Sequence, residues 1–221
     1  MKLRRNKILK ISKIIYLQLC DRIGRLNRML FRNKIERKKL NNTNFTIFSQ
    51  NCIGSVMYHD LGLQFNSPTI NMLFKSKDFI KFLDNLNLYL SEKIVFIESD
   101  KKYPVGKLYD IEIEFVHYHN QEEVLKAWNR RKKRINLNNL FVICCDDGLS
   151  YDDILFFDNL PYKNKVIFLS KQYKNIKSGI YCKDFSDKTD ARLLNFSNLL
   201  GQRYYQKYFD YIKFLNDRYK E

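Results

Sequence analysis

The fold is decided by the stretch Leu140-Phe141-Val142-Ile143-Cys144, which runs on into Cys145-Asp146-Asp147-Gly148. Five consecutive apolar residues are typical of a strand that is covered on both faces, as in the middle of a parallel sheet. The Asp-Asp-Gly that follows is typical of a turn. The sequence therefore predicts a central strand that ends in a turn at Asp146.

Strands and helices alternate on both sides of this stretch. We predict strands at residues 45–49, 93–97, 110–117, 140–144, 166–169 and 179–182, and helices at 52–58, 76–90, 120–134, 150–157 and 202–219. Residues 103–106 read as a loop. Residues 110–117 alternate acidic and apolar, which predicts an antiparallel or edge strand with one wet face. The pattern predicts an α/β fold, a three-layer α/β/α arrangement with a mixed, largely parallel sheet.

The positive charge is concentrated in the first 40 residues. The whole chain carries a formal charge of +16, and residues 1–40 hold 14 Lys and Arg against only Asp21 and Glu36, a net of +12. Residues 41–221 hold 26 basic and 22 acidic residues, a net of +4. We therefore divide the chain into a basic arm, residues 1–40, and a single α/β domain, residues 41–221. A basic arm indicates an anionic partner.

The arm has the pattern of an amphipathic helix. Apolar residues recur at steps of three and four and form one stripe: Ile8, Ile11, Ile15, Leu19, Ile23, Leu26 and Leu30. Such a helix can lie in the interface of an anionic membrane, which is the partner we expect for residues 1–40. The alternatives are packing of the stripe on its own domain or on a second copy, and nucleic acid. The body's modest charge and the lack of a nucleic-acid reading motif count against nucleic acid.

Cysteine usage and hydropathy indicate the compartment. Five cysteines (Cys20, Cys52, Cys144, Cys145 and Cys182) are an odd number without metal-ligand spacing, which favours reduced thiols. The longest uncharged stretch in the arm has seven residues, 14–20, whereas a membrane span needs about 20. No secretory signal is recognisable. We expect a cytoplasmic protein, peripheral at the inner face of the cell membrane.

Three polar clusters follow predicted strands, where open α/β sheets bind ligands. They are Cys52, the pair His117 and His119, and Asp146-Asp147. At a helix N-terminus Cys52 would gain thiolate character, His117 could act as its base and Asp147 could orient the histidine. This constellation suits acyl transfer through a thioester, with a donor such as acetyl-CoA. For each residue the alternative is structural: a small residue under a turn, a strand-end histidine and a turn aspartate.

A basic run occupies the end of the predicted helix at 120–134. Arg130, Arg131 and Arg134 belong to this run and are candidates for binding the phosphate of a nucleotide sugar or a lipid pyrophosphate. The alternative is a solvated face at a helix C-terminus, where cations are favoured. The chain has no phosphate-cradling glycine loop, no serine elbow and no zincin motif.

Several segments together resemble one bacterial family. The matching segments, in order, are Asn51-Cys52-Ile53-Gly54, residues 61–69, Tyr103-Pro104-Val105-Gly106, Phe115-Val116-His117-Tyr118, residues 128–136 and residues 160–165. In this order they resemble the domain-of-unknown-function family nineteen-nineteen over about residues 44–215. The arm is not part of the resemblance.

The resemblance implies an α/β fold and a role in bacterial surface polysaccharide. Members are commonly labelled exopolysaccharide or capsule biosynthesis proteins, and some acetyltransferases. It implies a polysaccharide or lipid-linked sugar intermediate as substrate, and within its motifs we expect Asn51, Asn66 and Ser67 to contact it. The family pattern is Asp-x-Asp-Gly where this chain has Cys145-Asp146-Asp147-Gly148, so we predict no metal site.

The leading hypothesis is O-acyl transfer onto a polysaccharide intermediate. The alternatives are a glycosyl- or phosphosugar transferase that uses the aspartates and the basic run, and a non-catalytic assembly factor that docks through its arm.

Overall fold

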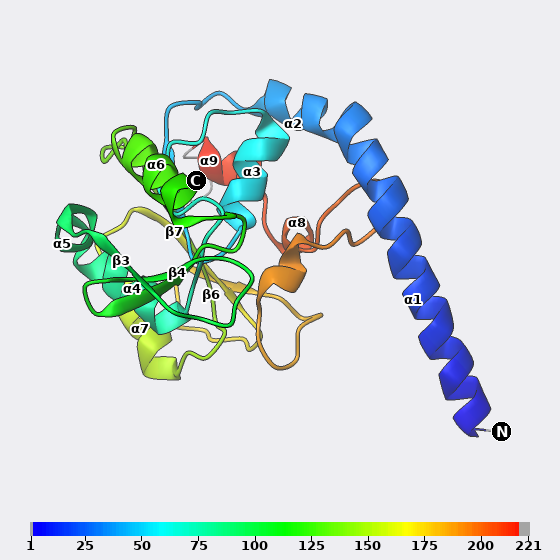
Figure 1. The fold of residues 1–221 in the computed structure, drawn as a ribbon. Helices are drawn as coiled ribbons and strands as arrows, with labels where there is room; N and C mark the ends of the chain where they lie inside the picture. The colour runs from blue at the N-terminus through cyan, green and yellow to red at the C-terminus, as the bar shows by residue number, and fades with distance from the viewer. Residues whose placement is uncertain (1, 217–221) are drawn as a thin grey trace.

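The structure, a computed structural model, describes residues 2–216, with the side chains of Ser12 and residues 15–216. At its centre lies a four-stranded parallel sheet in the order β1-β6-β7-β8 (Figure 1). Its strands are β1 (Thr46–Ser49), β6 (Leu140–Cys145), β7 (Asn164–Leu169) and β8 (Gly179–Tyr181). Strand β6 lies between β1 and β7, and its residues from Phe141 to Cys145 are buried. The predicted central strand is confirmed.

A second, antiparallel sheet has the order β2-β5-β4-β3. Its strands are β2 (Leu73–Phe74), β3 (Ile94–Ile97), β4 (Val105–Leu108) and β5 (Ile111–Glu114). In β5 Ile111 and Ile113 are buried and the two glutamates are half-buried, which confirms the strand with one wet face. The predicted loop at 103–106 is wrong in its second half. Gly106 lies in β4, where a Cβ would approach the Ile94 side chain to 2.9 Å, so the close pairing with β3 requires glycine.

Helices cover both faces of the parallel sheet, which confirms the α/β prediction (Figure 1). On one face Phe48 and Val142 pack with helices α4, α6 and α7 and with the antiparallel sheet. On the other face Ile47 and Ile143 pack with α3, α8 and α9. These helices are α3 (Ile53–Leu61), α4 (Ser76–Asp84), α6 (Gln121–Lys132), α7 (Tyr151–Asn159), α8 (Tyr205–Tyr208) and α9 (Tyr211–Leu215).

Two predicted helices are interrupted. The helix expected at 76–90 consists of α4 and α5 (Leu86–Ser91), because Asn85 leaves the helical region with φ −123°. The helix expected at 202–219 consists of α8 and α9, since Phe209 between them is extended with φ −142°. The last three residues of that predicted helix lie outside the described residues. A short 3₁₀ helix, η2 (Ala191–Leu194), precedes α8 and α9.

The N-terminal arm is one long helix in three parts, as predicted. These are α1 (Lys2–Asn27), a π-helical turn η1 (Arg28–Arg32) and α2 (Asn33–Lys39). Helix α1 extends away from the body, and its C-terminal part approaches the segment around residues 194–203 (Figure 1). Among residues 2–216 no helix is long and apolar enough to cross a membrane.

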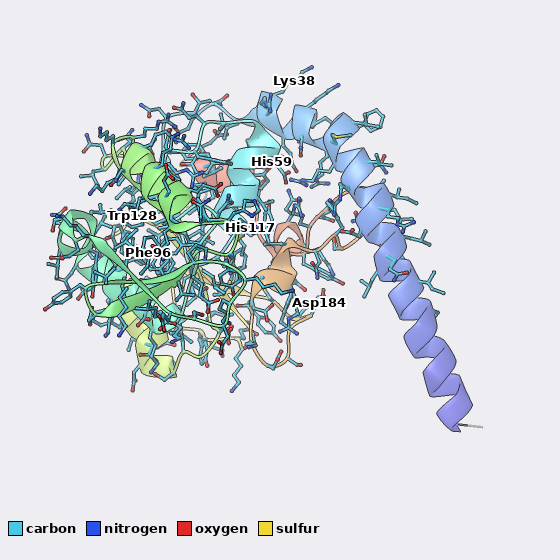
Figure 2. The ribbon with its side chains drawn as sticks, in the orientation of Figure 1. Lys38, His59, Phe96, His117, Trp128 and Asp184 are labelled. Carbon is cyan, nitrogen blue, oxygen red and sulfur yellow. The ribbon has the colours of Figure 1, made fainter. Side chains whose placement is uncertain are left out.

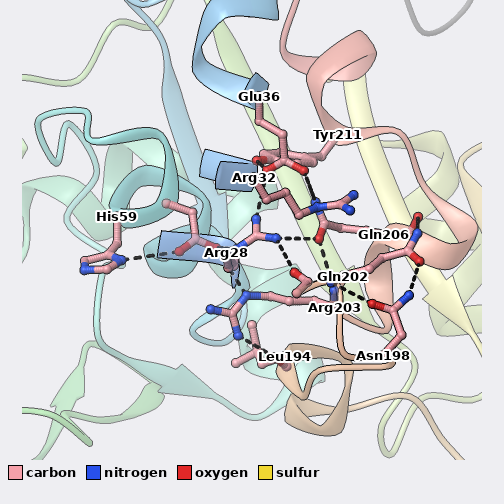
Figure 3. Close-up of polar contacts among 12 residues, drawn as sticks. Arg28, Arg32, Glu36, His59, Leu194, Asn198, Gln202, Arg203, Gln206 and Tyr211 are labelled. Atoms are coloured by element: carbon pink, nitrogen blue, oxygen red, sulfur yellow. Dashed lines mark hydrogen bonds and ion pairs between the residues drawn. The ribbon is translucent and has the colours of Figure 1, made fainter. Parts of the chain in front are cut away.

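A buried ionic network joins the arm to the body (Figure 3). The Arg28 guanidinium forms ion pairs with Asp60, at the end of α3, and with Glu36 at 2.9 Å. It also donates to the Gly201 carbonyl at 2.9 Å. The hydroxyl of Tyr211 donates to Glu36 at 2.6 Å. Arg28 and Glu36 therefore anchor the arm on the body.

Candidate functional site

A crevice opens at the carboxyl edge of the parallel sheet, between β1 and β6. After β1 the chain enters α3 on one face of the sheet, and after β6 it enters α7 on the opposite face. Because the two loops leave in opposite directions, a hollow remains between them, which is where open α/β sheets bind ligands. Its volume is about 480 Å³. The lining residues come from the loops after β1 and β6 and from β2, β5 and α4: Gln50, Leu73, Phe74, Lys75, Ser76, Lys77, Asp78, Glu114, Asp147 and Gly148.

The floor of this crevice is a set of hydrogen bonds centred on Gln50. Its side-chain amide donates to Ser76 Oγ at 2.8 Å and to the Phe74 carbonyl at 3.2 Å, and its Oε1 accepts from the Cys145 N–H at 3.1 Å. The Ser76 hydroxyl in turn donates to the Asp147 carbonyl at 2.6 Å. Both ends of the amide are thus occupied, and the strand ends of the two sheets are fixed relative to one another.

The two aspartates after β6 have different surroundings. The buried carboxylate of Asp146 accepts four hydrogen bonds of 2.6–2.8 Å, from the N–H and hydroxyl groups of Ser170 and Thr189. This saturates its oxygens, so Asp146 holds the loops after β7 and β8. The carboxylate of Asp147 is partly exposed at the crevice and pairs with Lys188 at 3.0 Å. The hydrogen bond to Asp147 raises the pKa of Lys188 above its usual value.

Charges of both signs surround the crevice. Lys75 and Lys77 stand at the start of α4, whose N-terminus has no side-chain cap. Their ammonium groups pair with Glu112 at 3.4 Å and with Asp153 at 3.1 Å. Ser76, the first residue of this helix, is bonded through its hydroxyl to Gln50 and Asp147. Ammonium groups bind phosphate oxygens, and carboxylates accept hydrogen bonds from sugar hydroxyls, so the mixture suits a ligand that carries both groups.

Cys52 lies where the sequence predicts, immediately before α3, but its thiol has the opposite character. Burial raises the pKa of Cys52 to about 11, so the thiol is protonated at neutral pH. Burial therefore opposes the thiolate that the sequence predicts at this position. The neighbouring Asn51 is also committed internally. Its Oδ1 accepts from the Ile53 N–H at 3.0 Å and its Nδ2 contacts the Cys145 sulfur at 3.4 Å.

His117 is not joined to the other predicted catalytic residues. It is exposed in the turn after β5, and Figure 2 shows its place on the loop. No hydrogen bond links Cys52, His117 and Asp147 among the described residues. The chain neighbour Tyr118 is the buried member of this turn, and its hydroxyl donates to the Ile70 carbonyl at 3.1 Å. The Cys52 thiol is close enough to contribute to the raised pKa of Tyr118, whose main cause is burial.

The predicted substrate-binding arginines differ in exposure. Arg130 is exposed, and Arg134 reaches the Phe65 carbonyl at 3.5 Å. Arg131 is buried, with its Nη1 donating to the Tyr118 hydroxyl at 2.5 Å and to the Ile70 carbonyl at 3.2 Å. Burial lowers the pKa of Arg131. This arginine therefore holds the segment before β2 and does not line the crevice.

Asn66 and Ser67 belong to the same segment. The carbonyl of Asn66 accepts from the Thr46 hydroxyl at 3.2 Å, and the buried Ser67 hydroxyl bonds to Thr69 at 3.1 Å. Of the nine predicted site residues, only Asp147 lines the crevice. Within the described part of the chain, no group of three or more His, Cys, Asp and Glu side chains is placed to hold a metal ion.

Comparison with known proteins supplies the family. The sequence matches the family described as domain of unknown function (DUF1919) over residues 23–216. The chain belongs to the DUF1919 family. A Haemophilus influenzae relative named "Uncharacterized protein" is 42% identical over 188 residues, which cover 84% of this chain and 91% of the relative. The family resemblance seen in the motifs is thereby confirmed, but its expected start at about residue 44 is wrong, because the match includes residues 23–40 of the arm. The DUF1919 match begins inside α1, so it includes the part of the arm that is packed on the body.

Several of the DUF1919 motif segments meet in space. The end of α6 contacts the segment before β2 through Arg131 and Arg134, and Asn136 N–H donates to the Thr46 hydroxyl at 2.9 Å. These contacts are structural. The crevice residues Gln50, Lys75 and Lys77 lie outside the motifs and were missed. Gln50 directly follows β1, so its position at a strand end could have indicated a site residue. Lys75 and Lys77 follow β2, whose two residues have no recognisable strand pattern in the sequence.

Proposed function

We propose that this DUF1919 protein is a transferase of bacterial surface-polysaccharide synthesis that binds a phosphorylated sugar intermediate in the crevice. The proposal places it in the cytoplasm, peripheral at the inner face of the cell membrane. The polysaccharide setting follows the family resemblance. The phosphorylated sugar follows one observation: a hollow of about 480 Å³ at the carboxyl edge of the sheet is lined by lysines and carboxylates together. That volume lies in the usual range for small-molecule sites, roughly 300–1,000 Å³.

The roles of the lining residues follow from their chemistry. Lys75 and Lys77 bind phosphate oxygens and stabilise the negative charge that the leaving group gains as its bond to the sugar breaks. Asp147 accepts the proton of the acceptor hydroxyl as that oxygen forms the new bond. Before it can do so, its pair with Lys188 must open, which releases a third cation near the phosphate. Gln50 and Ser76 keep the two loops at the required separation.

Calorimetry with UDP-glucose and UDP-N-acetylglucosamine, each with and without Mg²⁺, tests this proposal. We expect binding by the wild-type chain and a loss of about tenfold or more in the Lys75→Ala/Lys77→Ala double variant, because each charge-assisted contact contributes about 1.5–3 kcal/mol. Lys126→Ala, an exposed lysine of α6, is the matched control. Wild-type protein that binds neither compound nor the corresponding sugar phosphates would remove the proposal.

The acyl-transfer version remains a second candidate because Cys52 is half-buried immediately before α3 and lies close enough to Tyr118 to affect its pKa. In this version the sulfur takes an acyl group from a thioester donor such as acetyl-CoA, and the donor thiol leaves. The raised pKa of Cys52 counts against it. Full polysaccharide acetylation by a Cys52→Ser variant in a deletion strain would exclude it.

The third candidate is a non-catalytic assembly factor. It predicts that Asp147→Asn and Cys52→Ser leave the polysaccharide unchanged, whereas deletion of the arm changes it.

A further inference from the structure

The N-terminal helix has an inner and an outer side. Cys20, Gly24 and Arg28, spaced by four residues, are buried against the body. The apolar stripe lies on another side of the helix and remains in solvent, with Ile15 52% and Leu26 53% exposed. Packing of the stripe on its own domain is therefore wrong for the described side chains. Ile8 and Ile11 lie outside them.

The body adds apolar side chains beside the arm. Leu200, in the turn before α8, is 72% exposed, the largest exposed fraction among the large apolar residues of the described chain. It lines a hollow of about 410 Å³ together with Phe31 and Ile35 of the arm, with Arg32 and Lys39 among the other lining residues. We call the combined surface the docking face. It comprises Ile15, Leu19, Ile23, Leu26, Leu30, Phe31, Ile35 and Leu200.

The turn that carries Leu200 is held tightly against the helix. Gly201 has φ +74°, and a Cβ there would lie 2.6 Å from the Gly24 carbonyl and 2.8 Å from the Arg28 nitrogen. The Asn27 side chain donates to the Leu199 carbonyl at 2.7 Å. Together with the buried pairs of Arg28, these contacts hold residues 24–28 of the arm against the body.

Charge decides what covers this face. Exposed cations flank it, among them Arg22, Lys34 and Lys38, and residues 1–40 carry a net charge of +12. A second copy would bring an equally charged helix against the first, which costs free energy through repulsion. An anionic bilayer surface offers negative headgroups for the cations and an apolar layer for the stripe.

We propose that the docking face lies in the interfacial layer of an anionic lipid bilayer, with α1 along the surface and Leu200 of the body at the same depth. The inference rests on the proposed membrane location but not on the proposed reaction. It adds that the body touches the bilayer and is held in one orientation, whereas an arm on a loose linker would only tether it.

Co-sedimentation of the full chain with vesicles tests the inference. One set contains equal parts of phosphatidylglycerol and phosphatidylcholine, and the other contains phosphatidylcholine alone. We expect binding to the anionic set that weakens as salt is raised. Leu26→Asp/Leu30→Asp should reduce it at least about tenfold, and Leu200→Asp by roughly three- to tenfold, because each places a charge in an apolar layer. Val95→Asp changes an exposed apolar residue of β3, whose exposed fraction of 63% lies between those of Leu26 and Leu200, and is the matched control.

Several outcomes would overturn the bilayer proposal or one part of it. Equal binding to both vesicle sets, or wild-type binding by Leu26→Asp/Leu30→Asp, overturns the proposal. A dimer in analytical ultracentrifugation that this double variant dissociates also overturns it, because the second copy would then be the occupant. Wild-type binding by Leu200→Asp overturns the contact of the body. UDP-glucose calorimetry on the same folded variants separates this result from the transferase proposal, since the docking variants leave the crevice residues unchanged.

Discussion

Arg28 of the N-terminal helix and Asp60 at the end of α3 form an ion pair in which both side chains are almost completely buried. Burial opposes the charge on Arg28, but Tyr205, Asp60 and Glu36 more than compensate and raise its pKa. Arg203 contacts the same Asp60 carboxylate at 3.2 Å. The two buried carboxylates are thus balanced by arginines from both ends of the chain.

Replacing Arg28 should therefore be strongly destabilising. We expect Arg28→Met to lower the free energy of unfolding by about 3–5 kcal/mol, because it leaves Asp60 and Glu36 buried with fewer cations. Arg25→Ala is the control, since Arg25 forms an exposed pair with Asp21 and should change stability by about 1 kcal/mol or less. Urea unfolding followed by circular dichroism measures both. Equal effects of the two substitutions would contradict the role given to the buried network.

Substitution of the two adjacent aspartates after β6 should lower the stability by different amounts. Asp146→Ala removes a buried acceptor of four hydrogen bonds, so we expect a loss of about 3 kcal/mol in the free energy of unfolding. Asp147→Asn breaks one partly exposed ion pair and should cost less than about 1 kcal/mol. If Asp147 is the proton acceptor of the proposed transfer, this second variant retains sugar-nucleotide binding but loses turnover. Thermal unfolding together with calorimetry separates the two effects.

The Cys52 thiol should react only in alkali. Because burial raises its pKa to about 11, alkylation by iodoacetamide should be slow at pH 7 and should accelerate toward pH 11. The same shift has a consequence for stability. The unfolded chain loses this proton near pH 8.5, earlier than the folded chain does, so this contribution to stability falls as the pH rises from about 8.5 to 11. Mass spectrometry of the Cys52 peptide, with Cys52→Ser as control, measures the reaction. Rapid labelling at pH 7 would instead favour the thioester mechanism.

Gly201 should tolerate no side chain. Its φ is +74°, and a Cβ at this position would lie only 2.6 Å from the Gly24 carbonyl, so we predict that Gly201→Ala forces the turn away from α1. We expect a loss of about 1–3 kcal/mol and faster amide hydrogen exchange in residues 20–32. Gly148→Ala is a matched control, because Gly148 also has positive φ, +72°, but has open space around it. Similar exchange in the two variants would show that strain, and not the contact with the arm, is responsible.

The centre of the fold could be predicted because β6 is a continuous apolar run and β7 contains one at residues 166–169. Strand β2 could not be predicted, since two residues carry no periodicity. Strand β4 was hidden because Pro104 and Gly106 indicate a loop, whereas Gly106 is required for close pairing with β3. The broken C-terminal helices have no proline or glycine at their junction to reveal the interruption.

The site was less predictable than the fold. The rule that ligands bind at carboxyl ends of strands selected Asp147, which lines the crevice, and it selected Asn51 and Cys52, one and two residues past Gln50. It failed for His117: Glu114 at the end of β5 lines the crevice, but the turn that follows leaves His117 exposed and buries Tyr118 instead. The spacing of Arg130, Arg131 and Arg134 in the sequence does not show which of them is buried. The one signal for Arg28 in the sequence was Glu36, an acidic residue that stands out in so basic an arm.

The buried network around Glu36 also sets an order of events during synthesis. It joins Arg28 and Glu36 to Arg203 and Tyr211, which are synthesised about 175 residues later. Until the C-terminal segment has emerged, the arm's charges remain in water and its helix has no fixed position. Domains fold as units once their chain has been made. A nascent chain would therefore present the basic helix before the domain exists, and only a chain made through Tyr211 would hold that helix at a defined angle.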